Sequence, residues 1–179
     1  MKAKVVIIDD VKFALADHGR ALSTAGYGIV WVTRTTDLKQ ILEGKEHNDA
    51  SFYIIDVRMP PGRVYANEAT GGGDFTGLFI ARDVRQRFPL VPIILWTNSG
   101  KEEILKAAKK HQTTIPGCRY VKKIHVPPSE LQKELDYYLK NKKFRPKTFI
   151  LLWRTIKAGA CLLKIAADVT EVSRLGSAH

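Results

Sequence analysis

Short apolar runs rich in β-branched residues alternate with longer amphipathic stretches along about the first 140 residues. The hydrophobic pattern changes between the two, as expected where buried strands alternate with helices. This alternation constrains the fold most, because it is typical of an α/β domain with a parallel sheet. The expected strands cover residues 4–8, 28–32, 51–55, 92–96 and 119–123, and the expected helices cover approximately 11–25, 36–44, 77–87, 101–111 and 128–141.

One connection is much longer than the others. After the third expected strand, roughly twenty residues pass before a helical pattern returns, and a connection of that length is usually either functional or mobile. It contains three glycines in succession, Gly71, Gly72 and Gly73. Because the lysine and the hydroxyl residue of a nucleotide-binding P-loop are missing, this run favours a flexible connector over a phosphate cradle.

Basic residues concentrate in the last part of the chain. The 179 residues carry a net charge of +11, and from Lys140 onward nine Lys and Arg stand against Asp168 and Glu171. This stretch therefore carries +7, and residues 1–139 carry the remaining +4. We expect an α/β domain over 1–141, followed over 142–179 by a basic linker and an amphipathic C-terminal helix. The broad apolar face of that helix either folds back on the domain or binds a second copy or another partner.

The sequence favours a cytoplasmic location without a membrane span. The first apolar run has only four residues before two aspartates, which is too short for a signal peptide or a spanning helix. In the C-terminal stretch, Arg154, Lys157 and Lys164 would each be costly at the centre of a bilayer. The two cysteines lie far apart, without the spacing of a zinc site or a disulfide framework, so we expect reduced thiols.

Polar side chains stand where the expected strands end. Asp9 and Asp10 follow the first strand, Asp56 ends the third, Thr97 ends the fourth and Lys123 ends the fifth. In an open parallel sheet, ligands bind beyond the carboxyl ends of the strands. We therefore expect these five side chains to share one site.

The residue types in this group point to phosphoryl chemistry. Carboxylates brought together repel one another and raise each other's pKa unless a cation holds them, and Mg²⁺ prefers such oxygen ligands. A carboxylate beside that ion, Asp56, can act as a nucleophile toward phosphorus and form an aspartyl phosphate. Lys123 and Thr97 can supply the positive charge and the hydrogen-bond donor that the phosphoryl oxygens need.

Four segments carry a resemblance to a known family. VVIIDD, IIDVRMP, ILWTNSG and YVKKI, in this order and at these strand ends, resemble the receiver domain of two-component response regulators over about residues 3–140. The resemblance implies a flavodoxin-like fold, with a five-stranded parallel sheet in the order 2-1-3-4-5 and helices on both faces. It also implies that a histidine kinase or a phosphotransfer protein supplies the phosphoryl group.

The resemblance assigns individual roles. Asp56 would be the phosphoacceptor, and Thr97 and Lys123 would hold the phosphoryl group. Tyr120 would rotate between outward and inward positions in a movement coupled to Thr97. The Mg²⁺ ligands would be the carboxylates of Asp9, Asp10 and Asp56 together with the backbone carbonyl of Arg58.

The sequence departs from the family pattern in two places. Lys123 is followed by Ile124, where the family has a proline after a cis peptide bond. An insertion of about a dozen residues, within 61–76, precedes Gly77, and it could cover the acidic pocket or bind a partner. Our hypothesis for Arg58, two residues past Asp56, is that it slows hydrolysis by pairing with the phosphoryl oxygens; the alternative is a solvated surface arginine.

Two further side chains are expected to lie away from the site. Lys122 should point to the opposite face of the sheet from Lys123, because side chains alternate along a strand. His18 should lie on the exposed surface of the first helix.

The favoured function is that of a phosphoacceptor response regulator whose phosphorylation switches a protein–protein interaction surface, rather than an enzyme acting on other substrates. The alternatives are an adaptor that is not phosphorylated and a nucleic-acid binder that uses the basic tail. No helix-turn-helix pattern is present, which argues against sequence-specific DNA recognition. A phosphohydrolase with an aspartate nucleophile would need a second acid two positions later as general acid and base, and Arg58 stands there.

Overall fold

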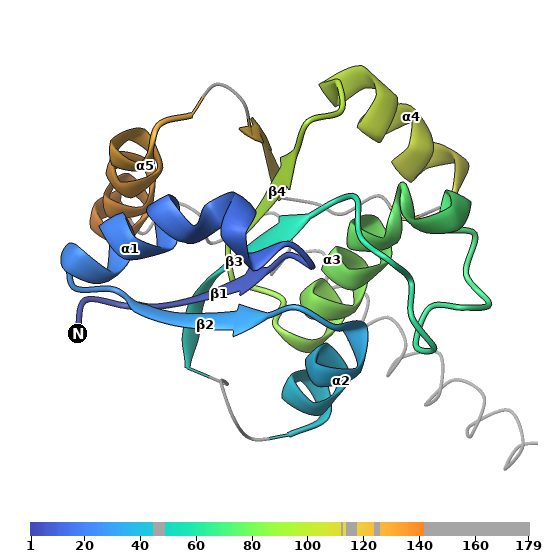
Figure 1. The fold of residues 1–179 in the computed structure, drawn as a ribbon, viewed down its shortest axis with the longest axis horizontal. Helices are drawn as coiled ribbons and strands as arrows, with labels where there is room; N and C mark the ends of the chain where they lie inside the picture. Colours follow the sequence, from blue (N-terminus) through green and yellow to red (C-terminus); the bar gives the residue numbers. More distant parts are fainter. Residues whose placement is uncertain (45–48, 112, 114–117, 124–125, 142–179) are drawn as a thin grey trace, which may run out of the picture. The chain divides into compact units, whose positions relative to one another are not determined.

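The computed structural model describes residues 1–44, 49–111, 113, 118–123 and 126–141. Within these ranges, five parallel strands form one sheet in the order β2-β1-β3-β4-β5. Helices cover both faces of this sheet (Figure 1). The predicted α/β fold and its strand order are therefore confirmed.

The strands lie where the hydrophobic pattern places them, to within a residue or two. β1 (Lys4–Ile8) and β2 (Gly28–Val32) match the predicted bounds. β3 (Ala50–Asp56) is longer than predicted, and β4 (Ile93–Thr97) and β5 (Cys118–Lys122) are each shifted by one residue. Asp56 and Thr97 are thus the last residues of their strands, whereas Lys123 lies just past β5 and does not end it.

The prediction for the first helix is wrong at its N-terminal end. A short 3-10 helix, η1 (Lys12–Leu15), precedes α1 (Ala16–Thr24). In the preceding turn, the carboxylate of Asp9 accepts a hydrogen bond from the backbone N–H of Val11 at 2.9 Å, and such a local bond competes with helical geometry. The other helices are α2 (Thr35–Glu43), α3 (Thr76–Arg87), α4 (Lys101–Lys110) and α5 (Pro128–Asn141).

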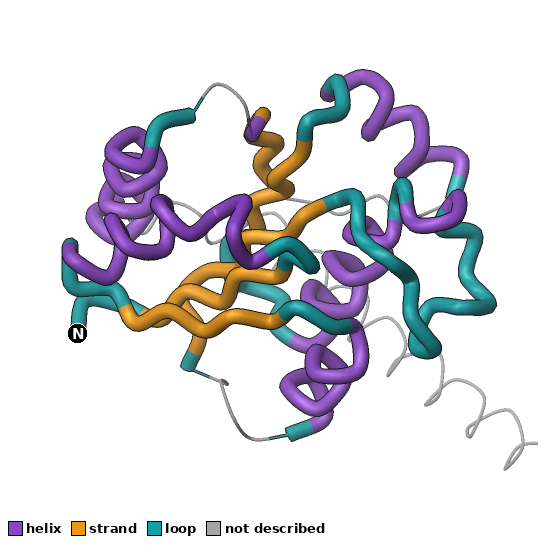
Figure 2. The backbone as a smooth tube through the Cα atoms, viewed as in Figure 1, coloured by secondary structure: helices purple, strands orange, loops and turns teal. Residues whose placement is uncertain are grey.

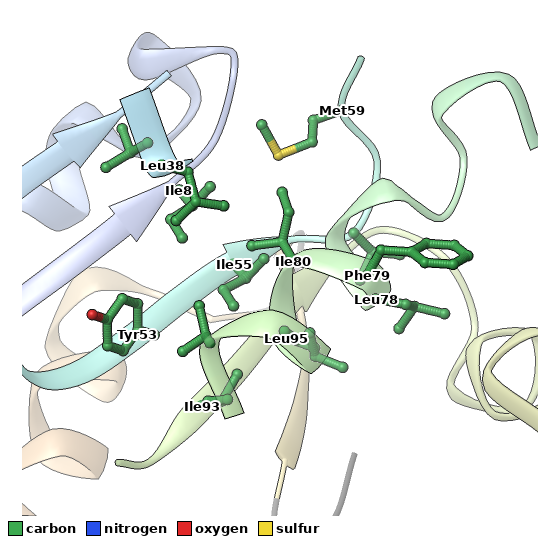
Figure 3. Close-up of a cluster of buried hydrophobic side chains, with 14 of the residues drawn as sticks. Ile8, Leu38, Tyr53, Ile55, Met59, Leu78, Phe79, Ile80, Ile93 and Leu95 are labelled. Carbon is green, nitrogen blue, oxygen red and sulfur yellow. The ribbon is translucent and has the colours of Figure 1, made fainter. Parts of the chain in front are cut away.

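Alternate residues of the central strands enter two separate apolar cores. Val6 and Ile8 pack into the core under α2, α3 and α4, while Val5 and Ile7 pack into the core under α1 and α5. Figure 3 shows part of the first core, where Leu38 of α2 lies beside Ile8 of β1 and side chains of β3 and β4 lie with those of α3. Burial on both faces explains why these strands read as continuous apolar runs.

The C-terminal part of the prediction lies outside the described residues. This applies to the basic linker and amphipathic helix over 142–179, to Cys161, and to the basic charges that carry the nucleic-acid alternative. Ile124 also lies outside them. Within the ranges given above, no helix is both long and apolar enough to cross a membrane.

The insertion between β3 and α3 is packed against the domain. It is the long loop segment that leads from β3 to α3 in Figure 2. Tyr65 at its centre is only 2% exposed, and its hydroxyl donates a hydrogen bond to Asp83 of α3 at 2.9 Å. Arg82 of α3 donates to Glu68 at 2.9 Å, and the Thr35 hydroxyl of α2 bonds the backbone of the loop. The insertion is therefore anchored on α2 and α3.

The glycine run is not the flexible connector that its composition suggested. Gly71–Gly73 form a short 3-10 turn in which all three residues have positive φ, a conformation that glycine adopts without strain. The backbone N–H of Met59 donates to the Gly73 carbonyl at 3.1 Å, and the N–H of Gly77 donates to Val57 at 3.0 Å. These two bonds bring the end of the insertion back beside its start.

Gly77 lets α3 begin directly against the end of β3. A Cβ atom at this position would collide with the backbone oxygen of Asp56 and would lie 2.6 Å from the Cα of Val57. Neither neighbour is a side-chain end that could move aside. The distance between α3 and the strand that carries Asp56 is therefore set by the absence of a side chain at position 77.

We expect Gly77→Ala to lower the free energy of unfolding by about 3 kcal/mol or more, because a methyl group would be forced into closely packed backbone. The measurement is urea unfolding followed by circular dichroism. Gly100→Ala is the matched control, since a Cβ there meets nothing within 4 Å, and it should cost less than about 1 kcal/mol. Equal effects of the two substitutions would contradict the steric argument.

Candidate functional site

The carboxyl ends of β1 and β3 bring three carboxylates together. One oxygen from each of Asp9, Asp10 and Asp56 lies within 4.8 Å of the others. Asp9 is fully buried, Asp56 is 6% exposed and Asp10 is half-buried. The sequence prediction of an acidic cluster at this edge of the sheet is thus met by the geometry.

Lys123 supplies positive charge to this cluster. Its ammonium group donates to Asp56 Oδ2 at 2.7 Å and to Asp9 Oδ2 at 2.9 Å. The neighbouring Lys122, the last residue of β5, is exposed, whereas Lys123 lies past the strand with its ammonium on the two carboxylates. One ammonium against three carboxylates leaves a net charge of about −2 when all three are ionised, which is the charge that a divalent cation would balance.

Backbone groups orient the two buried carboxylates. The N–H of Arg58 donates to Asp56 Oδ1 at 3.2 Å, and the N–H of Val11 donates to Asp9 Oδ1 at 2.9 Å. In each residue, one carboxylate oxygen therefore faces the backbone and the other faces Lys123. These bonds set the directions of both side chains.

Burial dominates the ionisation of the site. Loss of solvent raises the pKa of Asp56 to about 6; Lys123 opposes this rise, and the negative charge of Asp9 adds to it. The pKa of Asp10 is also raised, chiefly by burial and further by Asp9. Burial alone would lower the pKa of Lys123, but its hydrogen bonds to Asp56 and Asp9 outweigh this and raise it. The charged carboxylates therefore favour a cation beside them.

Thr97 is placed to donate a hydrogen bond. It is the last residue of β4 and is 2% exposed. Its hydroxyl oxygen accepts the backbone N–H of Ser99 at 3.1 Å, which leaves the hydroxyl proton available to another acceptor. Thr97 pairs with Lys122 in the sheet, so it lies one position from Lys123 on the neighbouring strand.

Tyr120 lies farther from the carboxylates. It stands opposite Leu95 in the β4–β5 ladder, is half-buried and packs against the core under α2, α3 and α4. The structure thus brings Asp9, Asp10, Asp56 and Lys123 together directly, with Thr97 on the adjacent strand end. The movement assigned to Tyr120 stays a prediction.

The side chain of Arg58 lies toward the insertion. Its guanidinium is 3.6 Å from a carboxylate oxygen of Asp74, and both side chains are more than half exposed. Arg58 contacts Asp56 through its backbone N–H, while its guanidinium lies beside Asp74. Exposed pairs of this kind contribute little to stability, so Arg58 can exchange partners at low cost.

His18 is not on the exposed surface of α1, and the prediction for it was wrong. The imidazole is half-buried, lies edge-on to Trp96 at 5.1 Å between ring centroids, and contacts the backbone of Val126. The sequence around a polar helix residue does not indicate a hydrogen-bond partner that lies more than a hundred positions away. The contact could have been inferred only after α1 and α5 were placed on the same face of the sheet.

Similarity to known proteins is found in structure rather than in sequence. No family model matches the chain, and no curated protein does. A receiver domain protein (CheY-like) from Methanospirillum hungatei JF-1 aligns over 79% of this chain and 96% of its own, with a TM-score of 0.58 and 17% identity. A receiver domain protein from Clostridium thermocellum aligns over 79% and 97%, with a TM-score of 0.58 and 22% identity.

A third similar structure is the BeF3 activated DrrB receiver domain, which aligns over 79% of this chain and all of its own, with a TM-score of 0.56 and 22% identity. The chain has the response-regulator receiver fold. These three alignments cover 96% or more of each matching structure, so the shared fold extends over a whole receiver domain. The acidic cluster of this chain stands at the carboxyl ends of the strands within that fold.

We expect Lys123→Met to lower the free energy of unfolding by about 3 kcal/mol at neutral pH without added metal, because it leaves buried carboxylates without their cation. Thermal and urea unfolding would measure the loss. Lys122→Met is the control, as this exposed neighbour should change stability by less than about 0.5 kcal/mol. If the two variants were equally stable, Lys123 would not be balancing the charge of the cluster.

Proposed function

We propose that this chain is a phosphoacceptor receiver in which Asp56 accepts a phosphoryl group in a Mg²⁺-dependent reaction. The observation that carries the proposal is the convergence of Asp9, Asp10, Asp56 and Lys123 beyond the ends of β1, β3 and β5. Carboxylates with one cationic donor and a nearby hydroxyl form the set of groups that phosphoryl transfer to an aspartate requires.

The residues fit a magnesium ion. Asp9, Asp10 and Asp56 offer hard oxygen ligands within 4.8 Å of one another, and the backbone carbonyl of Arg58 is the remaining ligand implied by the resemblance. When bound, Mg²⁺ would neutralise charge on the carboxylates and on the phosphoryl oxygens. The raised pKa values of Asp56 and Asp10 are consistent with a site that gains from a cation.

The protein's own groups account for the remaining steps. A carboxylate oxygen of Asp56 attacks the phosphorus of the donor, and the bond from phosphorus to the leaving group breaks with its electron pair on that group. The negative charge of the carboxylate passes to the leaving group, and the phosphoryl oxygens bring their own negative charge to Asp56. Lys123 can transfer its hydrogen bond from Asp56 to these phosphoryl oxygens. The hydroxyl group of Thr97 can donate a hydrogen bond to the same oxygens.

We infer that the donor is a histidine kinase or a phosphotransfer protein and that the output is a change at a protein–protein surface. Phosphorylation adds negative charge at a buried site and so shifts a conformational equilibrium, with Tyr120 as the side chain expected to move. In this proposal the chain acts in the cytoplasm and catalyses at most its own phosphorylation and dephosphorylation. One structural neighbour is described as a BeF3 activated receiver domain, which supports a function in which the domain is switched to an activated state.

The first experiment measures the intact mass of the protein by mass spectrometry after incubation with Mg²⁺ and acetyl phosphate. We expect a gain of one phosphoryl group in the parent protein and none in Asp56→Asn, because the amide cannot act as the nucleophile. A gain of equal size in Asp56→Asn would place the modification elsewhere. No gain in either protein would favour the adaptor alternative.

The same assay tests the metal ligands. Asp10→Asn should slow phosphorylation about tenfold or more at limiting Mg²⁺, since it removes one ligand charge. Asp17→Asn removes the same charge from an exposed position on α1 and should leave the rate unchanged. Equal phosphorylation rates in the parent protein, Asp10→Asn and Asp17→Asn would exclude Asp10 from the metal site.

Arg58 is expected to affect the lifetime of the aspartyl phosphate. If it leaves Asp74 and pairs with the phosphoryl oxygens, Arg58→Ala should shorten the lifetime roughly two- to fivefold, and Asp74→Asn should lengthen it by freeing the guanidinium. Arg63→Ala, an exposed arginine within the insertion, is the control. A lifetime unchanged by Arg58→Ala would favour the solvated-surface alternative.

A further inference from the structure

Lys123 lies beyond the part of β5 that the sheet holds. The last paired position of the β4–β5 ladder joins Thr97 to Lys122, and among the described strands β5 pairs with β4 alone at the edge of the sheet. The bonds of Lys123 to Asp9 and Asp56 are made by its side chain. Its backbone therefore lies past the ladder, where contacts of the following residues can influence the position of the ammonium.

His18 reaches the segment that follows Lys123. Its Nε2 lies 2.8 Å from the backbone oxygen of Val126, 108 residues away in the sequence. A carbonyl oxygen only accepts hydrogen bonds, so Nε2 must carry a proton and donate. The bond joins α1 to the connection between β5 and α5, three residues after Lys123.

The same imidazole contacts the strand that carries Thr97. It meets the buried ring of Trp96 edge-on, at 75° between ring planes. Trp96 directly precedes Thr97 and pairs with Val121 in the β4–β5 ladder. His18 thus lies against the strand residue before Thr97 and bonds the segment after Lys123.

We propose that His18 is a positioning residue for Lys123. By donating to Val126 from a ring that packs against Trp96, it holds Val126, three residues after Lys123, so that the Lys123 ammonium remains between Asp9 and Asp56. This role rests on the proposed function, in which that ammonium transfers its hydrogen bond to the phosphoryl group. His18 itself contacts neither the carboxylates nor the reacting atoms in the contacts described here.

The bond and the packing of His18 can be separated by substitution. His18→Phe keeps an aromatic ring against Trp96 but removes the donor. His18→Gln keeps an N–H donor on a side chain of similar reach. His111→Phe is the matched control, because His111 is also half-buried and lies near the rings of Phe75 and Phe79 without contacting the β5–α5 connection in the described contacts.

The first readout is the rate of phosphorylation by acetyl phosphate at saturating Mg²⁺. We expect His18→Phe to slow it roughly three- to tenfold, the effect of losing one partly buried hydrogen bond. His18→Gln should restore most of the rate, and His111→Phe should leave it unchanged. Equal slowing by all three variants would show general loosening and would overturn the proposal.

The second readout does not require phosphorylation. The protein is acetylated with a limiting amount of an amine-selective reagent, and the modified lysines are located by peptide fragmentation. The extent of labelling at Lys123 is compared with that at the exposed Lys122, which serves as an internal reference. We expect the ratio of Lys123 to Lys122 labelling to rise in His18→Phe and to return toward the parent value in His18→Gln. An unchanged ratio in His18→Phe would overturn the proposal, even if its phosphorylation rate fell.

The two readouts also separate this inference from the proposed function. If the parent protein gains no phosphoryl group, the proposed function fails, while the labelling ratio still decides whether His18 positions Lys123. If the parent is phosphorylated and His18→Phe matches it in both rate and labelling, the proposed function stands and the role of His18 is lost.

Discussion

The site depends on one ammonium group shared by two buried carboxylates. Lys123 joins Asp9 and Asp56, so a single cation links the ends of β1, β3 and β5. Buried carboxylates without a partner would be costly or would take up protons. With Lys123 present, the cluster retains net negative charge when its three carboxylates are ionised, and the proposed binding of a divalent cation rests on this charge.

The end of β3 belongs both to the site and to the insertion. Asp56 is the last residue of the strand, and three residues later the backbone N–H of Met59 is bonded to Gly73 at the end of the insertion. Gly77 keeps α3 in contact with the same strand end. A change in charge at Asp56 would therefore act on backbone that is shared with the insertion, and Arg58 stands between the two with its side chain on Asp74.

Much of this arrangement could be predicted from local patterns. The hydrophobic runs predicted all five strands to within about two residues, and the polar residues at their ends predicted the members of the acidic site. The errors occurred where a contact distant in sequence overrode a local preference. Gly71–Gly73 look flexible by composition, but bonds to Met59 and the packing of Tyr65 order the segment. His18 looks like an exposed helix residue, but it is half-buried because its ring packs against Trp96 and bonds the backbone of Val126.

The sequence by itself determined the alternation of strands and helices and the polar residues that end the strands, because these properties depend on neighbours along the chain. Tertiary structure alone decided which of those residues meet. Lys123 and Asp9 are separated by 114 positions, and His18 and Val126 by 108. Such contacts depend on the order of the strands and on the face that each helix covers, since these place distant side chains within hydrogen-bonding distance and set the electrostatic balance of the site.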